Sequence, residues 1–195
     1  MRFIFNKFPD DVHFHPNEGW TPLKESSNLW IVQLHAIPFM IMNVILVIVP
    51  MRLMGIHFEI DVAKMFLSFL IFVPVHELLH ALFFPENIFS KNVFLGFTLK
   101  GFAPFAAYTG EMSRNRFMKV LLAPFLVITF LGFLYLIILG EDELIEHIIV
   151  FNALGASGDI LGVFLVLQQV PGNAIVRNKK TRTYWKMNNN PHNPH

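Results

Sequence analysis

Four long apolar stretches constrain the fold of this chain more than any other feature. They cover residues 29–51, 62–84, 117–139 and 144–170. An α-helix needs about 20 predominantly apolar residues to cross a bilayer, and each stretch is long enough. The stretches at 29–51 and 117–139 are apolar all round, whereas a helix on a soluble protein keeps a polar face. We therefore expect an all-α integral membrane protein with four transmembrane helices. The 15% of charged residues, against about 25% in soluble domains, agrees with this.

The distribution of basic residues predicts the orientation in the membrane. With four crossings both termini lie on one side, and of the 15 Lys and Arg residues only Arg52 and Lys64 fall on the other side. Because cytoplasmic loops carry the excess of Lys and Arg, we expect a multi-pass protein of the cell membrane with both termini in the cytoplasm. The chain then divides into a cytoplasmic segment (1–28), a transmembrane domain (29–170) and a basic cytoplasmic tail (171–195) that we expect to be disordered. The tail's end, WKMNNNPHNPH, has the composition of a disordered segment.

A different pattern occupies residues 92–110, between the second and third apolar stretches. The sequence NVFLGFTLKGFAPFAAYTG alternates loosely and carries Lys100 and Gly101 near its middle. This is typical of a short β-hairpin at the cytoplasmic membrane surface. An irregular loop is the alternative, and the sequence leaves both open.

Ionisable residues interrupt the second apolar stretch, in VPVHELLHALFFP (73–85). His76, Glu77 and His80 form the pattern H-E-x-x-H. On a helix, residues i and i+4 face the same way, so both imidazoles can reach one metal ion. Glu77 can then take a proton from a metal-activated water. A charged group at bilayer depth costs about 2.5–3.5 kcal/mol, which favours a functional role. The alternative is a histidine pair hydrogen-bonded to its neighbours near the lipid headgroups.

A third ligand has to come from another stretch. Catalytic zinc sites use three protein ligands, and the chain has no cysteine. The candidates are His35, Glu146, His147 and Asp159. His76 and Asp159 both lie about 21–23 Å into their predicted helices, which run in the same direction, whereas Glu146 and His147 lie at the opposite membrane surface. Asp159 is therefore the preferred third ligand, and His35 remains a rival.

Small residues surround Asp159, in the sequence FNALGASGDILG (151–162). Such residues let membrane helices approach closely, and they allow local unwinding beside a cavity. Asn152 lies about two helical turns before Asp159. Its amide could bind substrate or polarise an oxyanion, or it could hydrogen-bond between helices.

Together these residues resemble known peptidases. HELLH on one stretch, with Asn152 and Asp159 on a later Gly-rich stretch, resembles the site-2 protease group of intramembrane zinc peptidases, although NALGASGDI replaces that group's Leu-Asp-Gly pattern. The chain is more similar to a family of uncharacterised bacterial membrane proteins described as zincin peptidases, which pair HExxH with a downstream Gly-Asp. YTGEMSRNRFMKVLLAPF (108–125) also resembles that family. The resemblance covers about residues 60–170. It implies one Zn²⁺ held by His76, His80 and Asp159, with Glu77 as the catalytic base.

The expected function is a zinc-dependent intramembrane peptidase. Metal-activated water would hydrolyse a peptide bond of a transmembrane or membrane-associated protein, with Glu77 as general base. The same residues would also serve a metal-dependent hydrolase of a non-peptide membrane substrate, or a non-catalytic zinc-binding regulator. Membrane lipid is the other expected partner. The net charge of +1, without a basic stripe, gives no indication of a nucleic-acid partner.

Overall fold

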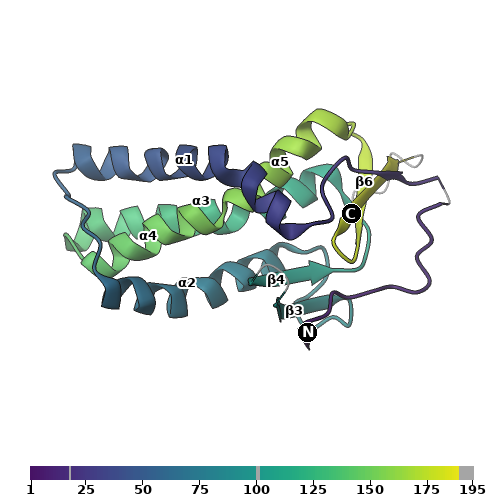
Figure 1. The fold of residues 1–195 in the computed structure, drawn as a ribbon, viewed down its shortest axis with the longest axis horizontal. Helices are drawn as coiled ribbons and strands as arrows, with labels where there is room; N and C mark the ends of the chain where they lie inside the picture. Colours follow the sequence, from purple (N-terminus) through teal and green to yellow (C-terminus); the bar gives the residue numbers. More distant parts are fainter. Residues whose placement is uncertain (18, 100–101, 189–195) are drawn as a thin grey trace.

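Three long helices occupy three of the four stretches predicted to cross a membrane. The computed structural model describes residues 1–17, 19–99 and 102–188. Helices α1 (Leu29–Leu53), α2 (Val62–Phe83) and α3 (Arg114–Leu139) are each long and apolar enough to cross a membrane. Together with α4 they lie along the long axis of the molecule (Figure 1).

The fourth predicted crossing is a broken helix. Helices α4 (Glu143–Gly155) and α5 (Ser157–Gln169) meet at Ala156 with a bend of 40°, and together they are apolar enough to count as a fourth span. The break falls within the small residues around Asp159, where local unwinding was expected. It places Asp159 in the first turn of α5 rather than in the middle of a continuous helix.

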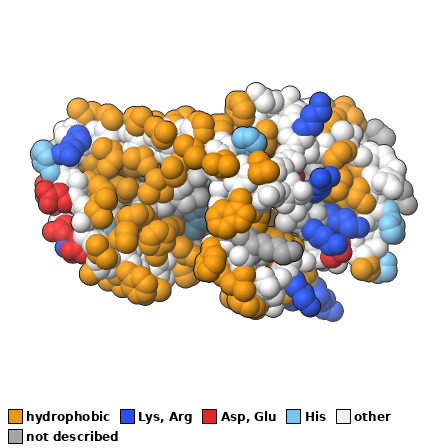
Figure 2. Space-filling model, viewed as in Figure 1, with side chains coloured by type: hydrophobic (Ala, Val, Ile, Leu, Met, Phe, Trp, Pro, Cys, Tyr) orange, Lys and Arg blue, Asp and Glu red, His pale blue; other side chains and the backbone are white. Residues whose placement is uncertain are grey.

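Each of the first four helices begins at a polar residue. The side chains of Asn28, Asp61, Ser113 and Asp142 accept hydrogen bonds from backbone N–H groups in the first turns of α1, α2, α3 and α4. These caps satisfy donors that a helix start would otherwise leave unpaired. Figure 2 shows the hydrophobic side chains spread over the helical half, with charged side chains at both ends of the molecule. This distribution fits a protein that crosses a membrane.

Two small sheets correct the expectation of an all-α protein. In the first sheet the strand order is β1 (Arg2–Phe5), β3 (Val93–Thr98) and β4 (Ala103–Tyr108). Strands β3 and β4 form an antiparallel hairpin, and β1 runs parallel to β3. The structure thus decides for a hairpin over an irregular loop in residues 92–110, although Lys100 and Gly101 lie outside the described residues.

Hydrogen bonds to the Glu86 carboxylate, three residues after the end of α2, connect this hairpin to the helix. Glu86 accepts a hydrogen bond of 2.7 Å from the Tyr108 hydroxyl, at the end of β4. Hydrogen bonds from Ser90, Asn92 and Tyr108 lower the pKa of Glu86 below its ordinary value. The fastening holds β4 beside α2.

The second sheet shows that the expectation of a disordered tail is wrong for most of that segment. Its strand order is β2 (Thr21–Pro22), β7 (Arg182–Met187), β6 (Ala174–Lys179) and β5 (Met112–Ser113). Charge and Asn content predicted disorder, but Ala174 and Val176 alternate into the core beside Leu23 and Phe117, which stabilises the hairpin. The last residues, 189–195, lie outside the described part. Both ends of the chain therefore pack over one end of the helices.

Candidate metal centre

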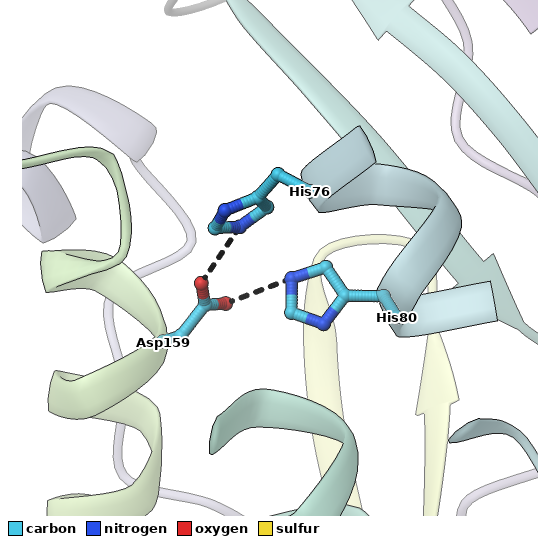
Figure 3. A group of neighbouring side chains, drawn as sticks. All are labelled: His76, His80 and Asp159. Carbon is cyan, nitrogen blue, oxygen red and sulfur yellow. Dashed lines mark hydrogen bonds and ion pairs between the residues drawn. The ribbon is translucent and has the colours of Figure 1, made fainter. Parts of the chain in front are cut away.

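Helices α2 and α5 bring three metal-ligating side chains together. His76 and His80 lie one turn apart on α2, both buried, and Asp159 on α5 faces them (Figure 3). The Nε2 atom of His76 is 3.1 Å from Asp159 Oδ2, and that of His80 is 3.4 Å from Asp159 Oδ1. One candidate ligand atom from each residue lies within 4.8 Å of the other two. The three residues that helical spacing and depth selected could therefore hold one metal ion.

The far side of each imidazole is held by an oxygen acceptor. His76 Nδ1 is 3.0 Å from Asn152 Oδ1, and His80 Nδ1 is 2.8 Å from the backbone carbonyl of Val120. The orientation of the Asn152 amide is set by its nitrogen, which donates to Pro124 O at 3.3 Å. Since both oxygens can only accept, each Nδ1 must carry the hydrogen and donate it. A neutral imidazole in this tautomer turns the lone pair of Nε2 toward Asp159.

Pro124 explains why the Val120 carbonyl is available. In a helix this carbonyl would accept from the N–H of the residue four positions later, but proline has no N–H. The freed carbonyl accepts from His80 instead. A neighbouring helix satisfies the carbonyl, as is usual for proline within membrane helices.

The donor set fits a divalent cation. When both imidazoles are neutral, two Nε2 lone pairs and a carboxylate converge as acceptors. Such contacts are stabilised by a cation between them or by protonation of the imidazoles. Imidazole nitrogen and carboxylate oxygen are ligands that zinc takes, and the hydrogen bonds behind each imidazole are the second-shell partners typical of metal-binding histidines.

Glu77 lies beside His76, His80 and Asp159, and one of its carboxylate oxygens forms no hydrogen bond within the described part of the chain. A backbone hydrogen bond from Ala106, on β4, reaches its carboxylate. Its Oε2 atom is buried and has no hydrogen-bond partner within the described part of the chain. A buried carboxylate oxygen without a donor is costly, so it is expected to serve chemistry rather than stability.

All four residues line one cavity of about 540 Å³. Phe69 and Phe72, nearer the start of α2 than His76, line it, and residues 102–106 of the hairpin form one wall. Glu25, Asn178 and Thr183 line its other end, within the structure formed by the two chain ends. The cavity thus runs from an apolar wall within the helices to a polar end among the strands.

A comparison with protein families agrees with this geometry. A family model described as "Putative zincin peptidase" matches residues 69–175, more than half of the chain. The chain belongs to this zincin peptidase family. No curated protein and no solved structure matches it.

The family match covers the whole candidate metal group. It extends from within α2 to the start of β6, and so includes the H-E-x-x-H pattern, the Val120 carbonyl, Asn152 and Asp159. Residues Glu25, Asn178 and Thr183 lie outside it. The polar end of the cavity is therefore built from parts of this chain that the family model does not describe.

The other residues weighed from the sequence lie elsewhere. His147 is buried near the start of α2, where its Nε2 accepts from the Asp61 N–H at 3.1 Å. Glu146 is buried beside it on α4, and His35 is exposed on α1. Asn152 does not line the cavity. It is fully buried behind His76, with both ends of its amide bonded to protein groups.

Sequence reasoning missed several residues at this site. The Val120 carbonyl belongs to the backbone, which leaves no sequence signal of its own, although Pro124 four residues later marks a freed carbonyl. The Ala106 N–H depends on strand direction. Glu25 and Asn178 lie in segments interpreted as a terminal segment and a tail, and only the alternation in AIVRNK could have indicated a strand there.

Proposed function

We propose that this protein is a zinc-dependent intramembrane peptidase. One observation carries the proposal. Glu77 Oε2 is buried and has no hydrogen-bond partner among the described residues, and it lies beside three side chains that could bind a metal ion. A metal-binding regulator would need the acceptors but not the unengaged carboxylate. Membership of the zincin peptidase family supports the same reading.

Each step of the proposed reaction falls to a group on this chain. His76, His80 and Asp159 would hold a zinc ion, which would supply a Lewis acid to activate water. Glu77 would remove one proton from this water, and the water oxygen would attack the scissile carbonyl carbon. Glu77 would then give the proton to the leaving nitrogen as the C–N bond breaks. The products are a carboxylic acid and an amine, so one water is consumed per bond cleaved.

The position of β4 supports a peptide substrate. β4 is the edge strand of the first sheet, and residues of its hairpin form one wall of the cavity. Its Ala106 N–H faces the Glu77 carboxylate, so the free edge lies next to the proposed catalytic base. An extended peptide can bind an exposed strand edge through main-chain hydrogen bonds. We infer that the substrate is a transmembrane or membrane-associated protein, unwound where it lies along β4.

The charge distribution supports an orientation with both termini in the cytoplasm. Arg52 and Lys64 lie at the end of the helices where α1 ends and α2 begins. The remaining Lys and Arg residues that the structure describes belong to the opposite end or to the segments that connect there. The positive-inside rule then assigns the end with the sheets to the cytoplasm, with the cell membrane around the helices. Cleavage would occur toward the cytoplasmic side of the bilayer.

The test compares the wild type with Glu77→Gln. Both purified proteins should hold about one zinc, because Glu77 is not in the ligand group. Cleavage of membrane-spanning reporter peptides should fall by about 10²–10⁴-fold in the variant, because general acid–base catalysis is removed. Glu146→Gln makes the same isosteric change at a buried carboxylate away from the cavity, and it should cleave normally. Undiminished cleavage by Glu77→Gln, or a zinc-loaded wild type that cleaves no peptide, would refute the proposal.

A further inference from the structure

The polar end of the cavity is built from both ends of the chain. Glu25 follows β2, and its Oε1 accepts the Thr183 N–H of β7 at 2.5 Å. Asn178 on β6 is the register partner of Thr183. Partners in neighbouring strands project to the same face of a sheet, so Asn178 and Thr183 lie together beside Glu25. All three line the cavity that contains the candidate metal group.

This end has a buried amide oxygen without a donor beside a carboxylate without an ion-pair partner among the described residues. Asn178 Oδ1 is buried and has no hydrogen-bond partner among the described residues. No ion pair joins Glu25 to any basic residue that the structure describes. Burial raises the pKa of the Glu25 carboxyl, although hydrogen bonds from Thr183 and the more distant charge of Arg182 oppose the shift. A half-buried carboxylate beside an unpaired amide oxygen is a favourable environment for a donor that carries positive charge.

We propose that Glu25 and Asn178 form a subsite that binds a lysine or arginine side chain of the substrate. The inference rests on the proposed peptidase function, because it assumes that a peptide occupies the cavity. It also specifies how the peptide lies in the cavity. Apolar side chains of the peptide face Phe69 and Phe72, and a basic side chain lies on the cytoplasmic side of the scissile bond. Membrane proteins carry their Lys and Arg residues on that side of the bilayer, so suitable substrates are common.

A purely structural role for Glu25 makes a different prediction. Its carboxylate also fastens the segment after β2 to β7 through the Thr183 N–H. Glu25→Gln keeps an acceptor oxygen for this hydrogen bond and removes only the charge. If Glu25 only holds this segment to β7, the Glu25→Gln variant should show the same ratio of affinities for basic and neutral peptides as the wild type.

The experiment measures binding separately from cleavage. Full-length protein carrying Glu77→Gln, in lipid nanodiscs, is titrated with fluorescent peptides that have an apolar segment and a single lysine moved residue by residue through the cytoplasmic flank. Each peptide is matched by one with norleucine, which keeps the stem of lysine without the charge. In one register lysine should bind about tenfold tighter than norleucine, as expected for a hydrogen bond to a charged group. Adding Glu25→Gln should reduce this ratio to about one.

The control is Glu111→Gln, which removes a carboxylate at the same end of the molecule. Glu111 pairs with Lys186 and does not line the cavity, so the lysine preference should persist. Equal affinities in every register, no binding of any peptide, or a preference that survives Glu25→Gln would each overturn the subsite. A lysine preference with no cleavage by protein that retains Glu77 would refute the peptidase and leave the subsite standing. Cleavage without the preference would refute the subsite alone.

Discussion

Two buried histidine sites on the transmembrane helices differ in how their ring nitrogens are used. Near the start of α2, His147 Nε2 accepts the Asp61 N–H at 3.1 Å, and its Nδ1 lies 2.6 Å from the Glu143 carbonyl. Both nitrogens of His147 are therefore bonded to the backbone. At the other site the Nδ1 atoms of His76 and His80 bond to an amide or backbone oxygen, and their Nε2 atoms lie 3.1 Å and 3.4 Å from the Asp159 carboxylate.

This difference separates a histidine that holds helices together from a pair arranged to bind a cation. Burial does not distinguish the sites, because all three histidines are buried. The distinction lies in whether the second nitrogen meets a donor or another acceptor. The Nε2 atom of His147 accepts a hydrogen bond, so both of its nitrogens are satisfied. The Nε2 atoms of His76 and His80 face a carboxylate, and a bound cation or a proton is needed to stabilise that contact.

The largest expected contrast is in metal content. His80→Ala and Asp159→Ala should each reduce bound zinc from about one per chain to almost none, because two ligands rarely retain zinc. His147→Ala should keep its zinc and instead lose about 1–3 kcal/mol of stability, since the Asp61 N–H loses its acceptor. Elemental analysis and thermal unfolding in detergent measure the two effects. Zinc loss in His147→Ala would show that the two sites are not separate.

The next effect concerns the acceptor behind His76. Asn152→Ala removes the oxygen that fixes this tautomer, and zinc affinity should fall about 10–100-fold. Competition with a chelator provides the measurement. Asn43 is a matched control, because it is equally buried and its amide donates to the Ala153 carbonyl rather than to a candidate ligand. A similar loss of affinity in Asn43→Ala would point to general loosening of the helices.

A smaller effect should follow from restoring an N–H in α3. Pro124→Ala supplies a donor that competes with His80 for the Val120 carbonyl, while it keeps the backbone oxygen that accepts from Asn152. Zinc affinity should fall on the order of threefold to tenfold, less than for loss of an acceptor. Pro38→Ala makes the same change in α1 and should leave the affinity unaltered. Unchanged affinity in Pro124→Ala would mean that proline is not needed to free this carbonyl.

Two glycine substitutions test whether α3 and α4 are closely packed while the wall of α5 is open. A Cβ atom at Gly132 would come within 2.5 Å of Ile149 Cγ1, whereas one at Gly158 would meet nothing within 4 Å. Gly132→Ala should therefore cost about 1–3 kcal/mol of unfolding free energy by overpacking. Gly158→Ala should gain up to about 1 kcal/mol, because alanine favours the helix. Unfolding in detergent should give opposite signs, and equal signs would contradict the open cavity wall at Gly158.

Parts of the fold with a strong local pattern were predictable. The apolar stretches gave three helices with ends close to those expected, because a run of this length has few other solutions in a bilayer. The hairpin at β3 and β4 was one of two alternatives. The C-terminal hairpin was missed because its strands are short and charged, and only their burial against Leu23 and Phe117 shows which side chains face inward.

The sequence by itself determined which stretches are apolar enough to cross a membrane and which side chains can hold a metal. Helical periodicity aligns His76 with His80, and equal depth selects Asp159, so these follow from position along the chain alone. Only the tertiary structure decided which oxygens lie behind the imidazoles, that β4 borders Glu77, and that Glu25 meets Asn178 in the same cavity. Those contacts join residues far apart in the chain. Several of them use backbone groups, whose positions and directions cannot be inferred from residue type.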